Sequence, residues 1–227
     1  MLDLWVCNLG LVPFAEANAL QEALRTARQA DAVPDTLLLL EHPPVYTRGR
    51  RSGAEELPDG PRFLGGTPIE IVDVDRGGRV TYHGPGQLVG YPVMRIGDII
   101  GYLRALEQAI IAALAQMGIV AEGGGERPTG VWTGGRKIAS LGVHVSRRVT
   151  THGFAVNVDG DLEPFEWIVP CGLAGVRMTS IARETGRAGN LDRFRVYLVR
   201  ELGRALERRP VPITTERLAD ALGAQVG

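Results

Sequence analysis

The sequence predicts an α/β protein in which helices pack on a mixed sheet, an arrangement of the α+β kind. Apolar runs of strand length are interleaved with amphipathic helical segments, but without the regular strand–helix alternation of a parallel sheet. A chain of 227 residues is long enough to bury a substantial core. Neither an internal repeat nor a low-complexity linker interrupts it, so we expect one catalytic domain over residues 1–227.

The N-terminal half is expected to begin with a strand and a helix. In order, the patterns predict a strand over residues 1–10, a helix over 14–28, a strand over 37–40, an irregular Gly- and Pro-rich loop over 52–68, a strand around 69–74 and a strand over 88–94. Pro13 precedes the helix, and the apolar run Leu37–Leu40 is short enough for a buried strand that ends before Pro43-Pro44. The strand around 69–74 leads into a glycine-rich loop.

The C-terminal half is expected to hold three helices around a β-rich region. Asp98 can cap a helix whose apolar residues follow helical spacing as far as Met117, and Gly118 can end it. Gly134-Gly135 lies between two extended runs and predicts a hairpin. The remaining elements are predicted as strands over 130–133, 136–145 and 153–158 and helices over 191–207 and 215–222.

Composition and motifs exclude several classes of protein. The formal net charge of −1 does not indicate nucleic-acid binding, and we expect no metal because no His, Cys, Asp or Glu spacing resembles a metal site. The sequence contains no phosphate-binding GxxxxGK[ST] loop, and Gly84–Gly90 misses GxGxxG by one position. No secretory signal and no apolar stretch of about 20 residues is evident. We therefore expect a soluble, cytoplasmic protein without membrane contact.

The stretch Arg76–Gln87 is the most informative segment of the chain. It combines four glycines, a proline, a histidine and two arginines directly after a strand-like run. Glycines allow backbone to approach a ligand closely, although a tight hairpin with incidental polar residues would have a similar composition. His83 and His152 each precede a glycine, and a histidine satisfied by backbone hydrogen bonds is the ordinary interpretation of both.

Two residues are candidates for covalent chemistry. Lys137 is the sole lysine of the chain, which otherwise uses arginine for positive charge, and a lysine amine can lose its proton where a guanidinium cannot. Cys171 stands between Pro170 and Gly172, a context typical of an exposed bend, whereas Cys7 lies in a predicted strand. A lone cysteine is most often a small buried hydrophobe. A neighbouring lysine favours the reactive thiolate, which makes Cys171 with Lys137 the alternative interpretation.

Four blocks of the sequence, spread over about half of the chain, together resemble the lipoyl(octanoyl) transferase family. They are Arg76–Tyr91, Gly135–Gly142, His152–Val158 and Pro170–Gly172. The resemblance implies the catalytic fold of biotin protein ligases and lipoate ligases. It also implies transfer of an octanoyl or lipoyl group from acyl carrier protein to a lysine of an apo lipoyl domain, in lipoate biosynthesis.

The resemblance further implies roles for individual residues. Cys171 matches the nucleophile that carries the acyl thioester, and Lys137 matches its activating lysine. The residues that match the acyl site are Arg76, Gly77, Gly78, Arg79, Val80, Thr81, Tyr82, His83, Ser140, Leu141, Gly142, Gly153, Phe154 and Ala155. No cofactor is implied, because the octanoyl group arrives on the 4′-phosphopantetheine arm of acyl carrier protein. The implied acceptors are lipoyl domains of 2-oxo acid dehydrogenase complexes and the glycine cleavage H protein, and the implied state is a monomer.

Two rival functions remain open at this point. An ATP-dependent lipoate or biotin ligase of the same fold needs no cysteine, and a non-catalytic binder of acyl carrier proteins needs neither Cys171 nor Lys137. Two basic clusters, Arg48 to Arg51 and Arg147-Arg148, are candidate docking patches for acidic partner proteins. They could equally be solvated turns.

Overall fold

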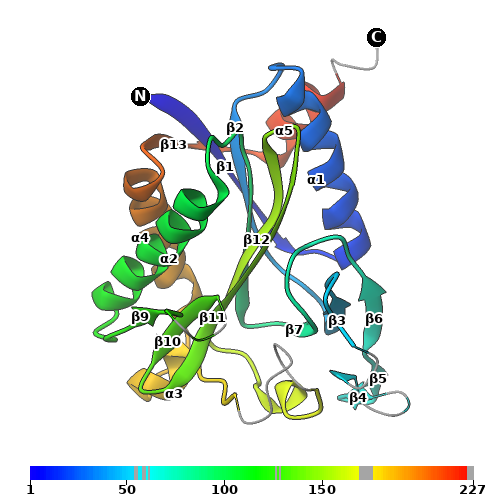
Figure 1. Cartoon of the computed structure of the whole chain (residues 1–227), viewed down its shortest axis with the longest axis vertical. Coiled ribbons are helices and arrows are strands. Elements are labelled where there is room, and N and C mark those ends of the chain that lie inside the picture. Colours follow the sequence, from blue (N-terminus) through cyan, green and yellow to red (C-terminus); the bar gives the residue numbers. More distant parts are fainter. Residues whose placement is uncertain are drawn as a thin grey trace.

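The computed structural model describes residues 1–53, 56–57, 60, 62–125, 127, 129–168 and 176–223. Figure 1 shows that its helices lie on both faces of a central sheet, which confirms the predicted fold class. The elements are β1 (Leu2–Leu11), α1 (Phe14–Gln29), β2 (Asp35–Glu41), β3 (Val45–Arg48), β4 (Phe63–Leu64), β5 (Thr67–Pro68), β6 (Glu70–Asp73), β7 (Thr81–His83), β8 (Gln87–Val93), α2 (Ile99–Gln116), β9 (Glu122–Gly123), β10 (Gly130–Thr133), β11 (Arg136–Ser146), β12 (Val149–Asn157), η2 (Glu163–Phe165), α3 (Ile181–Thr185), α4 (Leu191–Ala205), β13 (Arg208–Ile213) and α5 (Thr215–Gly223).

The central sheet is mixed. Within the described residues its strand order is β13-β1-β2-β8-β12-β11-β10-β9. β1 runs parallel to both β13 and β2, and the pairings from β2 through β8, β12, β11 and β10 to β9 are antiparallel. α2 and α4 cover one face of the sheet, and α1 and α5 cover the other (Figure 1). The sheet is thus the middle layer of three.

The position of β2 in the sheet explains why Leu37–Leu40 is an unbroken apolar run. Leu37 and Leu39 contribute to the core on the α2 and α4 face, whereas Leu38 and Leu40 contribute to the core on the α1 and α5 face. Successive side chains of a strand point to opposite faces, and both faces of this strand are covered. The prediction of a buried strand at this position is confirmed.

α2 begins and ends where the sequence predicts. The Asp98 carboxylate accepts hydrogen bonds from the backbone N–H groups of Ile100 and Gly101, at 3.2 and 2.6 Å, and Gly118 follows the helix with φ +79°. Contrary to the expectation that no stretch is long enough, the 18 residues of α2 could cross a membrane by length and composition alone. Core helices pass the same test, and α2 buries one face against the sheet and α4.

Several elements differ from the sequence-based expectation. The predicted irregular loop over 52–68 contains the β4–β5 hairpin. β13 was not predicted because Pro210 and Pro212 interrupt its pattern, but it is an edge strand, where proline is tolerated. β12 begins at Val149 rather than 153, after a turn in which Arg147 and Arg148 have φ +47° and +66°. Two consecutive positive φ values fit a hairpin turn, but arginine carries no sequence signal for one.

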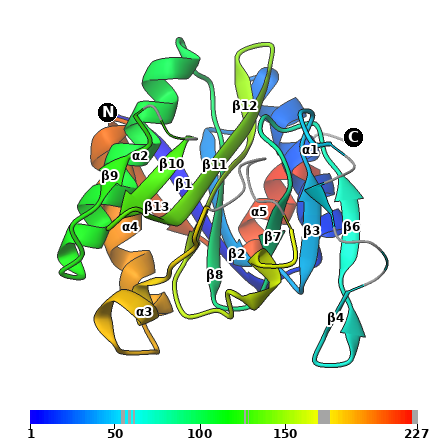
Figure 2. The ribbon, with the colours of Figure 1, turned by 60° about the horizontal axis from the view of Figure 1, so that its bottom comes forward.

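A second, three-stranded sheet holds the glycine-rich loop. Its order is β6-β3-β7, and β7 leads directly into β8 of the central sheet. In Figure 2 these three strands stand beside the central sheet, on the side opposite β9 and β10. The loop between β6 and β7 is tied to the central sheet by the backbone hydrogen bond from Gly77 to Val143, at 3.0 Å. This connection brings the glycine-rich segment to β11.

Candidate active site

A cavity of about 580 Å³ lies where the glycine-rich loop meets β11 and β12. This volume is in the range of small-molecule sites in proteins. The residues that line it are Phe14, Arg50, Arg51, Arg76, Gly77, Gly78, Arg79, Val80, Thr81, His83, Tyr91, Ile99, Leu103, Arg127, Thr129, Lys137, Ser140, Leu141, Gly142, Val143, His152, Gly153, Phe154 and Ala155. Three blocks that are distant in the sequence therefore share one cavity.

Most of the residues singled out from the sequence meet in this cavity. Lys137 lines it together with Arg76 to Thr81, His83, Ser140 to Gly142 and Gly153 to Ala155. Cys171 lies outside the described residues. Tyr82 is in a different place: its ring packs against Tyr46 and Phe165, with centroid distances of 5.7 and 5.4 Å. Tyr82 faces away because side chains alternate along β7, which turns Thr81 and His83 toward the cavity.

Lys137 is a buried lysine in the wall of the cavity. Its side chain is 1% exposed, and its Nζ lies 5.6 Å from the centroid of the Trp132 ring. Its backbone is held on both sides by the returning chain, because its N–H donates to the Arg177 carbonyl at 2.8 Å and its carbonyl accepts from the N–H of Thr179 at 2.9 Å. These bonds fix the backbone of Lys137, and the burial of its side chain restricts where the amine can lie.

A histidine and a tyrosine form a buried pair beside the cavity. His42 Nδ1 lies 2.7 Å from the carbonyl oxygen of Val12, and His42 Nε2 lies 2.7 Å from the hydroxyl of Tyr91. A carbonyl can only accept, so Nδ1 carries the proton and Nε2 accepts the Tyr91 hydroxyl proton. The tautomer of His42 and the direction of the Tyr91 hydroxyl are thereby fixed.

The two histidines that line the cavity are also held by side chains. His83 Nδ1 lies 2.6 Å from Gln87 Oε1, and the Gln87 amide donates to Asn157 at 2.9 Å. His152 Nε2 lies 2.8 Å from Asp75 Oδ1. These partners fix the ring orientations through side chains rather than through the backbone bonds that are the ordinary interpretation from sequence.

Burial keeps these histidines neutral. Burial lowers the pKa of His42 to about 4, and burial together with the nearby His42 lowers the pKa of His83 to about 3. Burial also lowers the pKa of His152, although its hydrogen bond to Asp75 acts in the opposite direction. These three rings therefore add no positive charge of their own to the cavity.

The depressed pKa values predict an acid-sensitive fold. Between the unfolded pKa of 6.5 and folded values of about 4 and about 3, the unfolded state binds more protons, so the free energy of unfolding falls as pH falls through this window. Each histidine contributes up to about 1.4 kcal/mol per pH unit. Denaturant titrations near pH 7 and pH 5 should show a smaller loss for His42→Gln than for wild type. Equal losses would contradict the assignment.

Sequence reasoning missed several residues of the site. His42 carried no signal because its partners, Val12 and Tyr91, are 30 and 49 positions away. Phe14 was read as the start of a helix, yet it also lines the cavity and packs against His42, with ring centroids 5.4 Å apart. Arg127 also lines the cavity. Its guanidinium lies 5.1 Å from the centroid of the Trp132 ring, a partner that no sequence pattern reveals.

The first basic cluster divides into two parts in the structure. Arg48 pairs with Asp73 through two contacts of 2.6 Å, whereas Arg50 and Arg51 line the cavity. The second cluster, Arg147-Arg148, forms the tip of the β11–β12 hairpin.

Among the described residues, no group of three or more His, Cys, Asp or Glu side chains is arranged to hold a metal ion.

The comparisons with known proteins place this chain and its fold in one class. Residues 13–203 match the family model of the lipoyl protein ligase A/B catalytic domain. A bi-partite lipoate protein ligase from Thermoplasma acidophilum has the same fold, with a TM-score of 0.71, 17% identity and coverage of 99% of this chain and 92% of that chain. Biotin protein ligase from Aquifex aeolicus is more distant, with a TM-score of 0.53, 12% identity and coverage of 91% and 70%.

A protein with a similar sequence defines the class of this chain more narrowly. The octanoyltransferase of Geobacter sulfurreducens is 49% identical over 187 residues, which are 81% of this chain and 76% of the relative. The chain belongs to the octanoyltransferases of the lipoyl protein ligase A/B catalytic domain family. It is an acyltransferase enzyme, which removes the reading as a non-catalytic binder.

Proposed function

We propose that this chain transfers an octanoyl group from the 4′-phosphopantetheine arm of acyl carrier protein to a lysine of an apo lipoyl domain, through a thioester on Cys171. The acceptors would be the lipoyl domains of 2-oxo acid dehydrogenase complexes and the glycine cleavage H protein. The Thermoplasma acidophilum structure is described as a ligase and its E2 lipoyl domain, which supports an acceptor of this kind. The acyl group arrives activated, so the reaction needs no ATP and no cofactor.

The observation that carries this proposal is a buried lysine in the wall of a cavity of about 580 Å³ whose lining includes apolar side chains and neutral histidines. Apolar side chains such as Leu141, Val143 and Phe154 line the cavity beside neutral His83. An octanoyl chain buried among such groups is stabilised by about 0.8 kcal/mol per methylene. Lys137 supplies the one amine of the chain at this site.

The course of the chain supports an encounter between Cys171 and Lys137. The Arg177 carbonyl accepts a hydrogen bond from the Lys137 N–H, the Thr179 N–H donates one to the Lys137 carbonyl, and Met178 pairs with Lys137 in an isolated parallel bridge. Arg177 to Thr179 follow Cys171 by six to eight positions in the sequence, which supports a role for Cys171 beside Lys137.

The chemistry consists of two acyl transfers. In the first, the Cys171 thiolate attacks the carbonyl carbon of the donor thioester; a new carbon–sulfur bond forms, the bond to phosphopantetheine breaks, and the departing thiolate takes a proton. In the second, the acceptor amine attacks the Cys171 thioester, an amide forms, and the amine proton leaves as the Cys171 thiolate is restored. The Lys137 ammonium favours the thiolate and can exchange these protons.

The proposal is tested by transfer in the absence of ATP. Purified protein mixed with octanoyl-acyl carrier protein should gain the mass of one octanoyl group, and addition of an apo lipoyl domain should move that mass to the domain. Transfer that occurs from octanoic acid and ATP, but not from octanoyl-acyl carrier protein, would instead establish an ATP-dependent ligase. The matched control is octanoic acid without ATP, which should acylate neither protein.

A further inference from the structure

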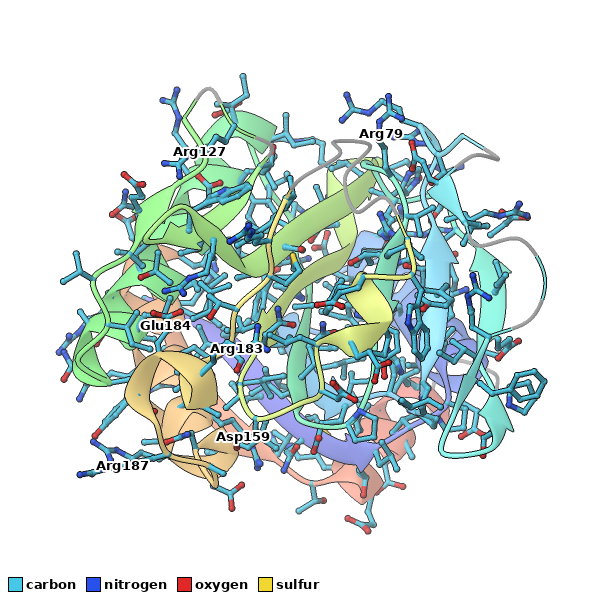
Figure 3. The ribbon with its side chains drawn as sticks, turned by 90° about the horizontal axis from the view of Figure 1, so that it is seen from below. Arg79, Arg127, Asp159, Arg183, Glu184 and Arg187 are labelled. Carbon is cyan, nitrogen blue, oxygen red and sulfur yellow. The ribbon has the colours of Figure 1, made fainter. Side chains whose placement is uncertain are left out.

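Positive charge is concentrated around the cavity without any neighbouring negative charge in its lining. Arg50, Arg51, Arg79 and Arg127 are exposed, Lys137 is buried, and none of the described residues that line the cavity is an Asp or Glu. In Figure 3 the labelled Arg79 and Arg127 lie near the upper edge of the molecule, whereas Arg187 lies toward the lower edge. An octanoyl chain is uncharged, so binding it does not require these positively charged side chains.

Most of these guanidinium groups have partners within the protein. Arg79 pairs with the buried Glu56, and Arg127 pairs with Glu122. The buried Arg76 donates to the carbonyl and the hydroxyl of Thr47, at 2.8 and 2.7 Å, and so holds the glycine-rich loop. The guanidinium groups of Arg76, Arg79 and Arg127 therefore already have partners within the protein.

Arg50 and Arg51 are different. Across the described part of the chain, neither of their side chains has an ion-pair or hydrogen-bond partner. Both side chains are exposed and both line the cavity. Two adjacent, uncommitted guanidinium groups at the opening of a binding cavity are well suited to an anionic group of the ligand.

The turn that carries the two arginines is fixed on the glycine-rich loop. The N–H of Arg50 donates to the Arg76 carbonyl at 3.2 Å, and the N–H of Arg51 donates to the Gly78 carbonyl at 3.1 Å. A Cβ at Gly49 would lie 2.6 Å from the Gly78 carbonyl oxygen, so this close approach requires glycine. The turn therefore fixes the backbone of both arginines at the cavity, so that both guanidinium groups can reach a ligand there.

We propose that Arg50 and Arg51 form a subsite for the phosphate group of the acyl donor. This inference rests on the proposed function, in which the donor arm carries a thioester at one end and a phosphate at the other. A guanidinium matches phosphate oxygens with two parallel N–H donors, and such charge-assisted bonds are stronger than neutral ones. The arm would then be held at its phosphate by Arg50 and Arg51 while its acyl end lies among the apolar side chains of the cavity.

The test compares binding of 4′-phosphopantetheine and of pantetheine, which lacks the phosphate, by titration calorimetry on the full chain. Wild type should bind 4′-phosphopantetheine at least about tenfold more tightly, the effect of one hydrogen bond to a charged group. In Arg50→Gln/Arg51→Gln this ratio should fall close to one. The matched control, Arg147→Gln/Arg148→Gln, changes the same charge at the β11–β12 turn and should keep the wild-type ratio.

Two outcomes would overturn the subsite: a ratio close to one in wild type, or a wild-type ratio in Arg50→Gln/Arg51→Gln. AMP serves as a third probe, because an acyl-adenylate also carries a phosphate. If AMP binds more tightly than 4′-phosphopantetheine and depends on the two arginines, the subsite serves a nucleotide and the proposal is wrong. Transfer from octanoyl-acyl carrier protein is measured in parallel; its failure with an intact binding ratio would reject the proposed function and leave the subsite standing.

Discussion

Replacing Cys171 with alanine or serine is expected to abolish the octanoyl adduct and to lower the rate of transfer by a factor of about a thousand or more, as loss of a covalent nucleophile does in other enzymes. A residual rate remains possible because the cavity still brings donor and acceptor together. Intact-mass spectrometry after mixing with octanoyl-acyl carrier protein measures the adduct, and the rate of lipoyl-domain acylation measures transfer.

Cys7 provides the matched control for this experiment. It is fully buried in the core on the α1 and α5 face, and burial, with the nearby Glu216 carboxylate, raises the pKa of its thiol. Both effects disfavour the thiolate that attacks a thioester. Cys7→Ala should therefore keep the adduct and the rate of transfer. An adduct on Cys7 in the wild-type protein would contradict the assignment to Cys171.

Local sequence patterns predicted the elements whose signals are local. The capped helix α2, the buried run in β2 and the Gly134-Gly135 hairpin are each specified by neighbouring residues, and the structure has all three. The elements that were missed depend on distant partners. β13 is held in place by its pairing with β1, 206 positions earlier in the chain, and its two prolines conceal its strand pattern in the sequence.

In the candidate site, too, local motifs could be predicted from the sequence and contacts between distant residues could not. Glycine-rich and lysine-containing motifs marked Gly77, Gly78 and Lys137, and the structure brings them to one cavity. The sequence could not show how His42 and Tyr91 pair, nor that alternation along β7 turns Tyr82 away, because both depend on tertiary packing.

The structure also shows which glycine substitution can test the role of the glycine-rich loop as a wall of the cavity. Gly78→Val follows from the sequence as a way to block the cavity, but Gly78 has φ +92°, where a β-branched side chain is strongly strained. Loss of activity in that variant would not separate a blocked cavity from a damaged fold. A Cβ at Gly77 would meet only the Val143 carbonyl oxygen, at 3.5 Å, which is an ordinary contact. Gly77→Ala is therefore the variant that tests the cavity wall.

Lys137 variants are expected to show the second large effect, a loss of transfer of about a hundredfold to ten-thousandfold, the usual contribution of general acid–base catalysis. Lys137→Met keeps the length of an unbranched side chain and removes the amine. Because Lys137 is buried in a strand, methionine should fill the same space and preserve the fold. The rate of Cys171 acylation and the rate of lipoyl-domain acylation should both fall, since each step moves a proton.

In principle, Lys137→Arg keeps the positive charge and removes proton transfer, but the structure shows that this variant also changes the packing. A Cβ at Gly130 would lie 2.5 Å from Lys137 Cε, which shows how closely the backbone packs against this side chain and how little room a guanidinium has. Lys137→Ala leaves space for a small amine instead. If Lys137 exchanges protons, added methylamine should restore part of the activity of Lys137→Ala but none of that of Lys137→Met, which fills the space. Near-wild-type transfer by Lys137→Arg, with no rescue of Lys137→Ala by methylamine, would show that the positive charge alone activates the thiol.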